Sequence, residues 1–120
     1  MIISGGVERL GASGYVDGDE TVGSLTLTVT DQSSFHVLCC FNHYGYINSW
    51  GCARKFMGAL GGTSGMHIVF DDNITSGNGG SWTITRTSAT TLTIQKTAGS
   101  YSGGGYWFID IVGNNLISFA

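Results

Sequence analysis

The chain has 120 residues, and its 42% hydrophobic and 12% aromatic content excludes disorder despite 20 glycines. Its net charge is −3 and its five lysines and arginines are mostly scattered. This excludes nucleic acid as a partner, because a phosphate-binding surface needs a clustered basic patch. No segment approaches the roughly 20 apolar residues of a membrane span, so no membrane partner is expected either.

The composition also predicts the fold class. Glycine, serine and threonine are abundant and proline is absent, and no stretch combines helical spacing with good helix formers and caps. We therefore expect an all-β protein, an antiparallel, jelly-roll-like β-sandwich of six to eight short strands. The low share of charged residues, 11%, is typical of a subunit whose surface neighbours largely occupy.

The N-terminal residues are polar and weakly patterned. We expect an N-terminal arm or irregular edge segment over residues 1–23, followed by one β-sandwich domain over residues 24–120. The beginning of the chain has neither a basic start nor a useful apolar run, so no signal peptide is expected.

The first half of the domain contains two clear strands. Residues 24–30 alternate apolar and polar side chains, which predicts a strand with one wet face. Residues 34–41 are apolar on both faces and predict a central strand. Residues 42–65 form the longest irregular region, with room for one short strand or helical turn around residues 53–60.

Further strands follow at short intervals. Residues 66–70 predict a short strand that the polar residues 71–73 stop. Residues 81–86 and 90–96 alternate apolar and polar side chains, and we expect them to pair across the turn between them. A final short strand is expected over residues 116–119.

Residues 98–105 contain three consecutive glycines, which permit the positive backbone angles of a tight connection. We therefore expect a hairpin between residues 90–96 and the following strand, residues 106–112. That second strand has almost no polar face, so both of its sides need a cover, and a second copy of the chain is a natural one. The candidate oligomer interface consists of Tyr106, Trp107, Phe108, Ile109 and Ile111.

Cys39, Cys40, His43 and Cys52 form the cluster that most resembles a metal site. A structural zinc site commonly uses a CxxC or HxxxH pair, and neither occurs here. Adjacent cysteines on a strand point to opposite faces, so Cys39 and Cys40 are poorly placed to form a disulfide. We expect free, buried thiols in a reducing cytoplasm, with no metal and no cofactor.

Two acidic segments, residues 17–20 and 71–73, offer oxygen ligands for calcium, but neither follows the spacing of a calcium loop. Catalytic patterns are equally weak. The chain has no GxSxG motif, and His36 and His67 lie in apolar strands. We expect no catalytic residue and no enzymatic activity.

Aromatic side chains in the loops are the candidate ligand-binding residues. Tyr44, Tyr46 and Trp50 lie in the long irregular region, and Tyr101 lies in the Gly/Ser-rich connection. Aromatic faces on loops stack on sugar rings or anchor protein interfaces. The alternative is that these loops fold onto the core, with the rings as plugs.

Residues 91–113, TLTIQKTAGSYSGGGYWFIDIVG, resemble the C-terminal β modules of virion proteins of tailed bacteriophages, particularly those of tail fibres and tail-tip attachment proteins. The resembling part covers about a fifth of the chain. The resemblance implies a β-sandwich that assembles as a homotrimer and contacts other virion proteins. It also implies attachment to a host surface glycan or protein receptor, and it supplies no catalytic residue.

The leading hypothesis is therefore a non-enzymatic virion protein of a bacteriophage, a trimeric tail-fibre or tail-tip component that contributes to host attachment. It would fold in the host cytoplasm and then join the virion. The start at Met1 and the lack of an upstream coiled coil or repeat favour a separate small subunit. One alternative is a capsid decoration or cement protein, and a second is a carbohydrate-binding module.

Overall fold

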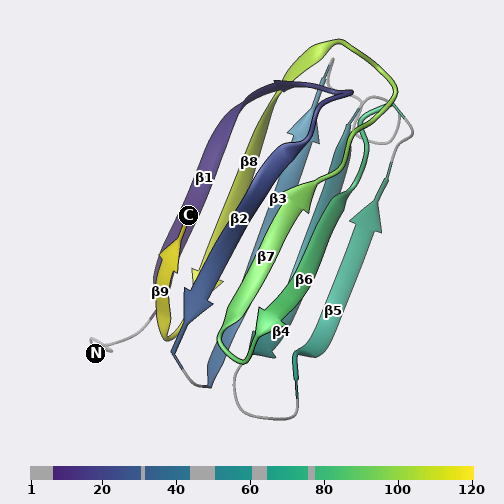
Figure 1. Ribbon diagram of the computed structural model, residues 1–120. Helices are drawn as coiled ribbons and strands as arrows, with labels where there is room; N and C mark the ends of the chain where they lie inside the picture. Colours follow the sequence, from purple (N-terminus) through teal and green to yellow (C-terminus); the bar gives the residue numbers. More distant parts are fainter. Residues whose placement is uncertain (1–6, 31, 44–50, 61–64, 76–77) are drawn as a thin grey trace.

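The computed structural model describes residues 7–30, 32–43, 51–60, 65–75 and 78–120. These residues form strands and no helix, as Figure 1 shows. The strands in chain order are β1 (Glu8–Asp17), β2 (Val22–Val29), β3 (Ser33–Asn42), β4 (Cys52–Leu60), β5 (His67–Ile74), β6 (Trp82–Ser88), β7 (Thr91–Lys96), β8 (Gly104–Gly113) and β9 (Leu116–Phe119).

The strands form two antiparallel sheets that pack against each other (Figure 1). One sheet has five strands in the order β1-β8-β3-β4-β5, and the other has four in the order β6-β7-β2-β9. The prediction of an all-β antiparallel sandwich is therefore confirmed. β3 pairs with β8 on one side and with β4 on the other, so it is the central strand that its two apolar faces predict.

The core lies between the two sheets, because successive side chains of a strand point to opposite faces. The five-stranded sheet contributes Val37, Phe56 and Ile111, and the four-stranded sheet contributes Leu27 and Trp82, all of them buried. The Nε1 of Trp82 also donates a hydrogen bond of 3.2 Å to the carbonyl of Cys52 across the sandwich.

The expected hairpin between residues 90–96 and 106–112 is wrong. β7 lies between β6 and β2 in the four-stranded sheet, whereas β8 lies between β1 and β3 in the five-stranded sheet. The connection after Lys96 therefore crosses from one sheet to the other. Its sequence signal, turn residues between two strands, is the same for a hairpin and for a crossing, so local pattern could not separate them.

The glycines of this connection serve close packing rather than positive backbone angles. Among the described glycines, positive φ occurs at Gly65 and Gly80, and not at residues 103–105. A Cβ on Gly103 would lie 2.5 Å from Nε2 of His43, and one on Gly104 would collide with the hydroxyl of Tyr15. A side chain at either position would push these neighbours out of place.

Three segments differ in extent from the expectation. Residues 8–17, within the segment expected to be an arm or irregular edge segment, form the regular edge strand β1, which pairs with β8 over its whole length. Residues 52–60 adopt the strand alternative, as β4. The strand expected to stop at residue 70 continues as β5 to Ile74, because β5 is an exposed edge strand where aspartates remain in water.

Candidate functional site

The candidate functional site is the face of the five-stranded sheet that points away from the core, called here the outer face. Residues directly opposite each other in paired strands point to the same side of a sheet. The register therefore places large apolar side chains from all five strands on this one face. The exposed large hydrophobic residues of the outer face are Tyr15, Leu38, Met57, Phe70, Ile74, Tyr106 and Phe108.

An apolar surface of this kind is unusual on a monomer. Large contiguous apolar patches on soluble proteins generally mark interaction sites. In the described part of the chain the four-stranded sheet covers only the inner face, and no element lies over the outer face. The outer face is therefore the surface best suited to bind another molecule.

One end of the outer face carries an exposed aromatic pair, Tyr15 on β1 and Tyr106 on β8. The two residues are direct register partners, and their ring centroids lie 5.1 Å apart in a T-shaped arrangement. This is a preferred geometry for aromatic side chains, so each ring limits the motion of the other. Tyr15 is nevertheless 63% exposed and Tyr106 75% exposed.

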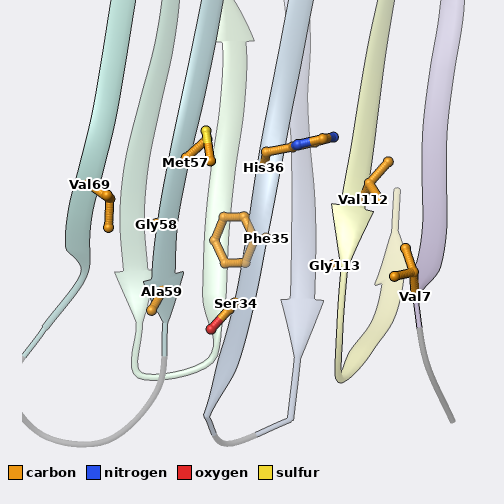
Figure 2. Close-up of a pocket in the computed structure, with 10 residues that line it drawn as sticks. All are labelled: Val7, Ser34, Phe35, His36, Met57, Gly58, Ala59, Val69, Val112 and Gly113. Carbon is orange, nitrogen blue, oxygen red and sulfur yellow. The ribbon is translucent and has the colours of Figure 1, made fainter. Parts of the chain in front are cut away.

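The other end of the outer face contains an apolar hollow with a volume of about 400 Å³ (Figure 2). Ser34, Gly58, Ala59 and Gly113 line it with small side chains or none, and larger residues stand around them. The larger residues of the outer face are Val7, His36, Met57, Val69 and Val112, and the core residue Phe35 also contributes to the lining. Val69, which is 73% exposed, occupies the irregular position where the pairing of β4 with β5 shifts register.

The aromatic pair and the hollow lie at opposite ends of the same face. Tyr106 and Val112 are six positions apart on β8, which separates them by about 20 Å along the strand. Phe108 and Leu38 lie between them on β8 and β3. The outer face thus has an exposed aromatic end, an apolar middle and an end with a hollow.

Basic and acidic side chains of the outer face occur in pairs. Arg9 on β1 donates hydrogen bonds of 2.8 and 3.1 Å to the carboxylate of Asp110 on β8. Lys55 on β4 is the register partner of Asp72 on β5. Arg9 and Asp110 therefore form an ion pair, and Lys55 and Asp72 place opposite charges on neighbouring strands of the same face.

The candidate interface residues of β8 separate into two groups by direction, two that point outward and three that point toward the other sheet. Tyr106 and Phe108 point outward and belong to the outer face. Trp107 is half-buried and packs near Trp82, with ring centroids 6.3 Å apart. Ile109 and Ile111 are buried in the core of the chain itself. The expectation that all five contact a partner is corrected for these two isoleucines, because the four-stranded sheet already covers them.

The candidate ligand-binding residues are only partly placed by the structure. Tyr44, Tyr46 and Trp50 lie outside the described residues. Tyr101 is half-buried, and its ring packs against His43 with centroids 5.3 Å apart. A ligand-binding role of these four aromatic residues stays a prediction.

The cysteines are free thiols, as predicted. Cys39 and Cys52 are buried, and burial raises the pKa of each thiol to about 12. Cys40 points to the outer face and is half-buried, and burial raises its pKa as well. A thiol with a pKa of about 12 is almost fully protonated at neutral pH, so Cys39 and Cys52 are poor nucleophiles.

Metal-binding side chains do not gather around these cysteines in the part of the chain that the structure describes. The acidic turn brings Asp17, Asp19 and Glu20 within 4.8 Å of one another. The buried ammonium of Lys96 donates to the carbonyls of Gly18 and Glu20 in the same turn, so a cation of the chain itself already lies there. The acidic cluster is therefore no evidence for a bound metal ion.

Sequence reasoning missed most of the outer face. Tyr15 lies in the segment expected to be an arm, and Met57 lies in the region expected to be irregular. A signal was present in residues 34–41, whose apolar side chains on both faces predict that the outward face is also covered.

No helix among the described residues is long and apolar enough to cross a lipid bilayer.

The fold defines the class of the protein as an antiparallel β-sandwich, with one apolar sheet face that none of the described elements covers. No family model matches the chain, and no curated protein matches it significantly. Among solved structures, the chain is similar to the tailspike protein of Acinetobacter phage vB_ApiP_P1, at 15% identity and a TM-score of 0.41. The match covers 92% of this chain, which spans 22% of that tailspike. A similarity this distant does not establish a shared fold.

Proposed function

We propose that this protein is a non-enzymatic structural subunit of a bacteriophage particle, a tail-fibre or tail-tip component that self-assembles and contributes to host attachment. The observation that carries self-assembly is the outer face, which leaves apolar side chains of all five strands in water when the chain is alone. Burial of such a surface is the dominant favourable contribution to protein association.

The assignment to a phage particle rests on the resemblance of residues 91–113 to virion β modules. In the fold, this segment forms β7, the crossing between the sheets and β8. It therefore supplies Tyr106 and Phe108 to the outer face. The part of the chain that resembles virion proteins and the surface that favours assembly coincide on β8.

The assembly claim is tested by sedimentation velocity of the purified chain between about 1 and 100 µM, the range in which specific interfaces of moderate affinity form. We expect a stable oligomer or a concentration-dependent one, and the resemblance implies three copies. A single monomeric species over the whole range would contradict the claim that the protein works as an assembly.

The location is tested with purified particles of the parent phage. Gold-labelled antibodies against the chain should mark the tail or its tip. Labelling of tail-less heads would instead support the capsid decoration protein, and absence of label from intact and dissociated particles would overturn the virion assignment.

The attachment claim needs a separate measurement. Purified protein added in excess should compete with phage particles for the host surface and slow their adsorption. Unchanged adsorption, together with no binding to isolated host surface polysaccharide or envelope protein, would contradict a role in attachment while leaving a structural role in place.

A further inference from the structure

The two ends of the outer face differ, since one end carries the exposed Tyr15–Tyr106 pair and the other carries the apolar hollow. We propose that the outer face binds a second copy of this chain end over end, so that the aromatic pair of each copy occupies the hollow of the other. This deepens the proposed function, on which it rests for the need to self-assemble, by naming the surface and its partner.

The outer face has the size that a stable pair needs. Five strands about 4.8 Å apart and about ten residues long cover roughly 24 by 33 Å, or about 800 Å². A standard specific interface buries about 800 Å² on each partner. One second copy is therefore sufficient to cover the face.

The charges of the outer face permit two identical faces to meet. Arg9 is bonded to Asp110 within one copy, and Lys55 lies opposite Asp72. When a face packs against its own copy, a charged group can come close to a like charge, and the Arg9–Asp110 ion pair lowers that repulsion because both signs lie side by side. The described residues of the outer face form no cluster of one charge sign that would attract a strongly charged partner.

The hollow suits a tyrosine ring in both size and chemistry. Its volume of about 400 Å³ falls within the range of about 300–1,000 Å³ typical of ligand pockets. Its lining is apolar except for a few groups, among them the Ser34 hydroxyl and the His36 ring. Tyrosine buries an apolar ring and needs a hydrogen-bond partner for its hydroxyl, and these two side chains offer one.

The end-over-end orientation follows from the positions of the two features. In a two-fold pair with the strands antiparallel, the aromatic end of each copy lies over the hollow of the other, and the contact forms twice. With the strands parallel, the aromatic ends of both copies lie at the same end of the pair, and both hollows stay empty. Three copies around an axis along the strands would also bring like ends together, so this pairing differs from the trimer that the resemblance implies.

Two single substitutions test the contact from its two sides. Tyr106→Asp removes the exposed ring, and Ala59→Arg fills the hollow. Each should weaken pairing at least tenfold, because aromatic side chains that fill a pocket of the partner contribute a large share of interface affinity. Ile117→Asp on β9 is the matched control, since Ile117 is 57% exposed on the other sheet and should leave pairing unchanged. Wild-type affinity in both test variants would overturn the proposal.

A mixture of the two variants tests the orientation. A heteropair consists of one copy of each variant and has two contacts. One contact is native, because the tyrosines of the Ala59→Arg copy lie in the intact hollow of the Tyr106→Asp copy. The other contact places the introduced aspartate beside the introduced arginine. Native mass spectrometry should therefore detect heteropairs at concentrations where each variant alone is monomeric. Absence of heteropairs would overturn the end-over-end arrangement.

Folding is checked by far-ultraviolet circular dichroism and thermal unfolding of each variant. If either test variant unfolds, Tyr106→Ser and Val69→Asp probe the same two ends at exposed side chains. The proposed function can fail separately. If Tyr106→Asp and Ala59→Arg both still form oligomers, the proposed interface is wrong and the virion role stands. If purified phage particles lack the protein, the virion role is wrong and the interface stands.

Discussion

Lys96 is a fully buried lysine whose ammonium group holds a turn of the chain. Its Nζ donates hydrogen bonds to the carbonyls of Gly18 (3.0 Å), Glu20 (2.8 Å) and Thr97 (3.1 Å). It also lies 4.7 Å from the centre of the Phe41 ring. Burial lowers the pKa of this lysine, and the carbonyls and the ring compensate part of the cost of burying its charge.

Replacement of Lys96 by methionine keeps the apolar stem but removes the donor of three carbonyl groups. We expect the free energy of unfolding to fall by roughly 2–4 kcal/mol, because buried acceptors without a donor are costly. Urea denaturation measures the change. Lys55→Met, at an exposed lysine of the outer face, is the control and should change stability by less than about 0.5 kcal/mol. Equal effects of the two substitutions would contradict a structural role of the Lys96 ammonium.

At the scale of elements, β5 is the least covered strand, since all eight of its residues are exposed. Among the described strands it pairs with β4 alone, and Arg54 on β4 strengthens this link with hydrogen bonds of 2.7 and 2.9 Å to Asp71. Arg54 also donates to the carbonyl of Trp82 on β6. The Arg54 guanidinium therefore connects β5 to β4 within the five-stranded sheet and to β6 in the four-stranded sheet.

Asp71→Asn should destabilise the protein by about 1 kcal/mol at pH 7, as expected for a paired, partly exposed carboxylate. The hydrogen bonds from Arg54 hold the pKa of Asp71 below its ordinary value of 3.8. This contribution is thus fully present above pH 3.8 and is lost as the pH falls through the native pKa. Denaturant titrations of both proteins from pH 7 into the acid range should show the difference shrinking to zero.

Asp72→Asn, on the opposite face of β5, is the control for this measurement and should have a smaller effect at pH 7. A difference between wild type and Asp71→Asn that grows in acid would contradict the ion pair as its source. Faster amide hydrogen exchange confined to β5 in the Asp71→Asn variant would support the role of Arg54 in holding the edge strand.

At the scale of the whole molecule, the sandwich separates the three cysteines by accessibility. Cys39 and Cys52 lie in the core with pKa values of about 12, whereas Cys40 lies half-buried on the outer face. We expect a single thiol of the native chain, Cys40, to react with iodoacetamide at pH 8. Peptide mass spectrometry identifies the modified residue, and all three should react after denaturation.

The reactivity of Cys40 also shows whether a second copy covers the outer face. If a second copy covers this face, alkylation of Cys40 should slow as the protein concentration rises. The Cys40→Ser variant supplies the background rate of the two core thiols. A rate for Cys40 that does not depend on protein concentration would contradict the covered face, and modification of Cys39 or Cys52 first would contradict the described core.

Much of the fold could be predicted from local pattern. Residues 24–29, 82–86 and 106–112 form strands where period-2 alternation or continuous apolar runs predict them. Sheet membership could not be predicted in this way. β7 and β8 follow each other in the chain but lie in different sheets, and the partners of β8, β1 and β3, are distant in sequence. Local sequence does not encode such long-range pairing.

The sequence by itself determined that residues 106–112 need a cover on both sides, because neither side of the strand is polar. Only the tertiary structure decided which side chains face which cover. Ile109 and Ile111 point into the chain's own core, and Tyr106 and Phe108 point outward. The physical reason is that a strand apolar on both faces carries no alternation that favours one side, so the register with β1 and β3 sets the direction of every side chain.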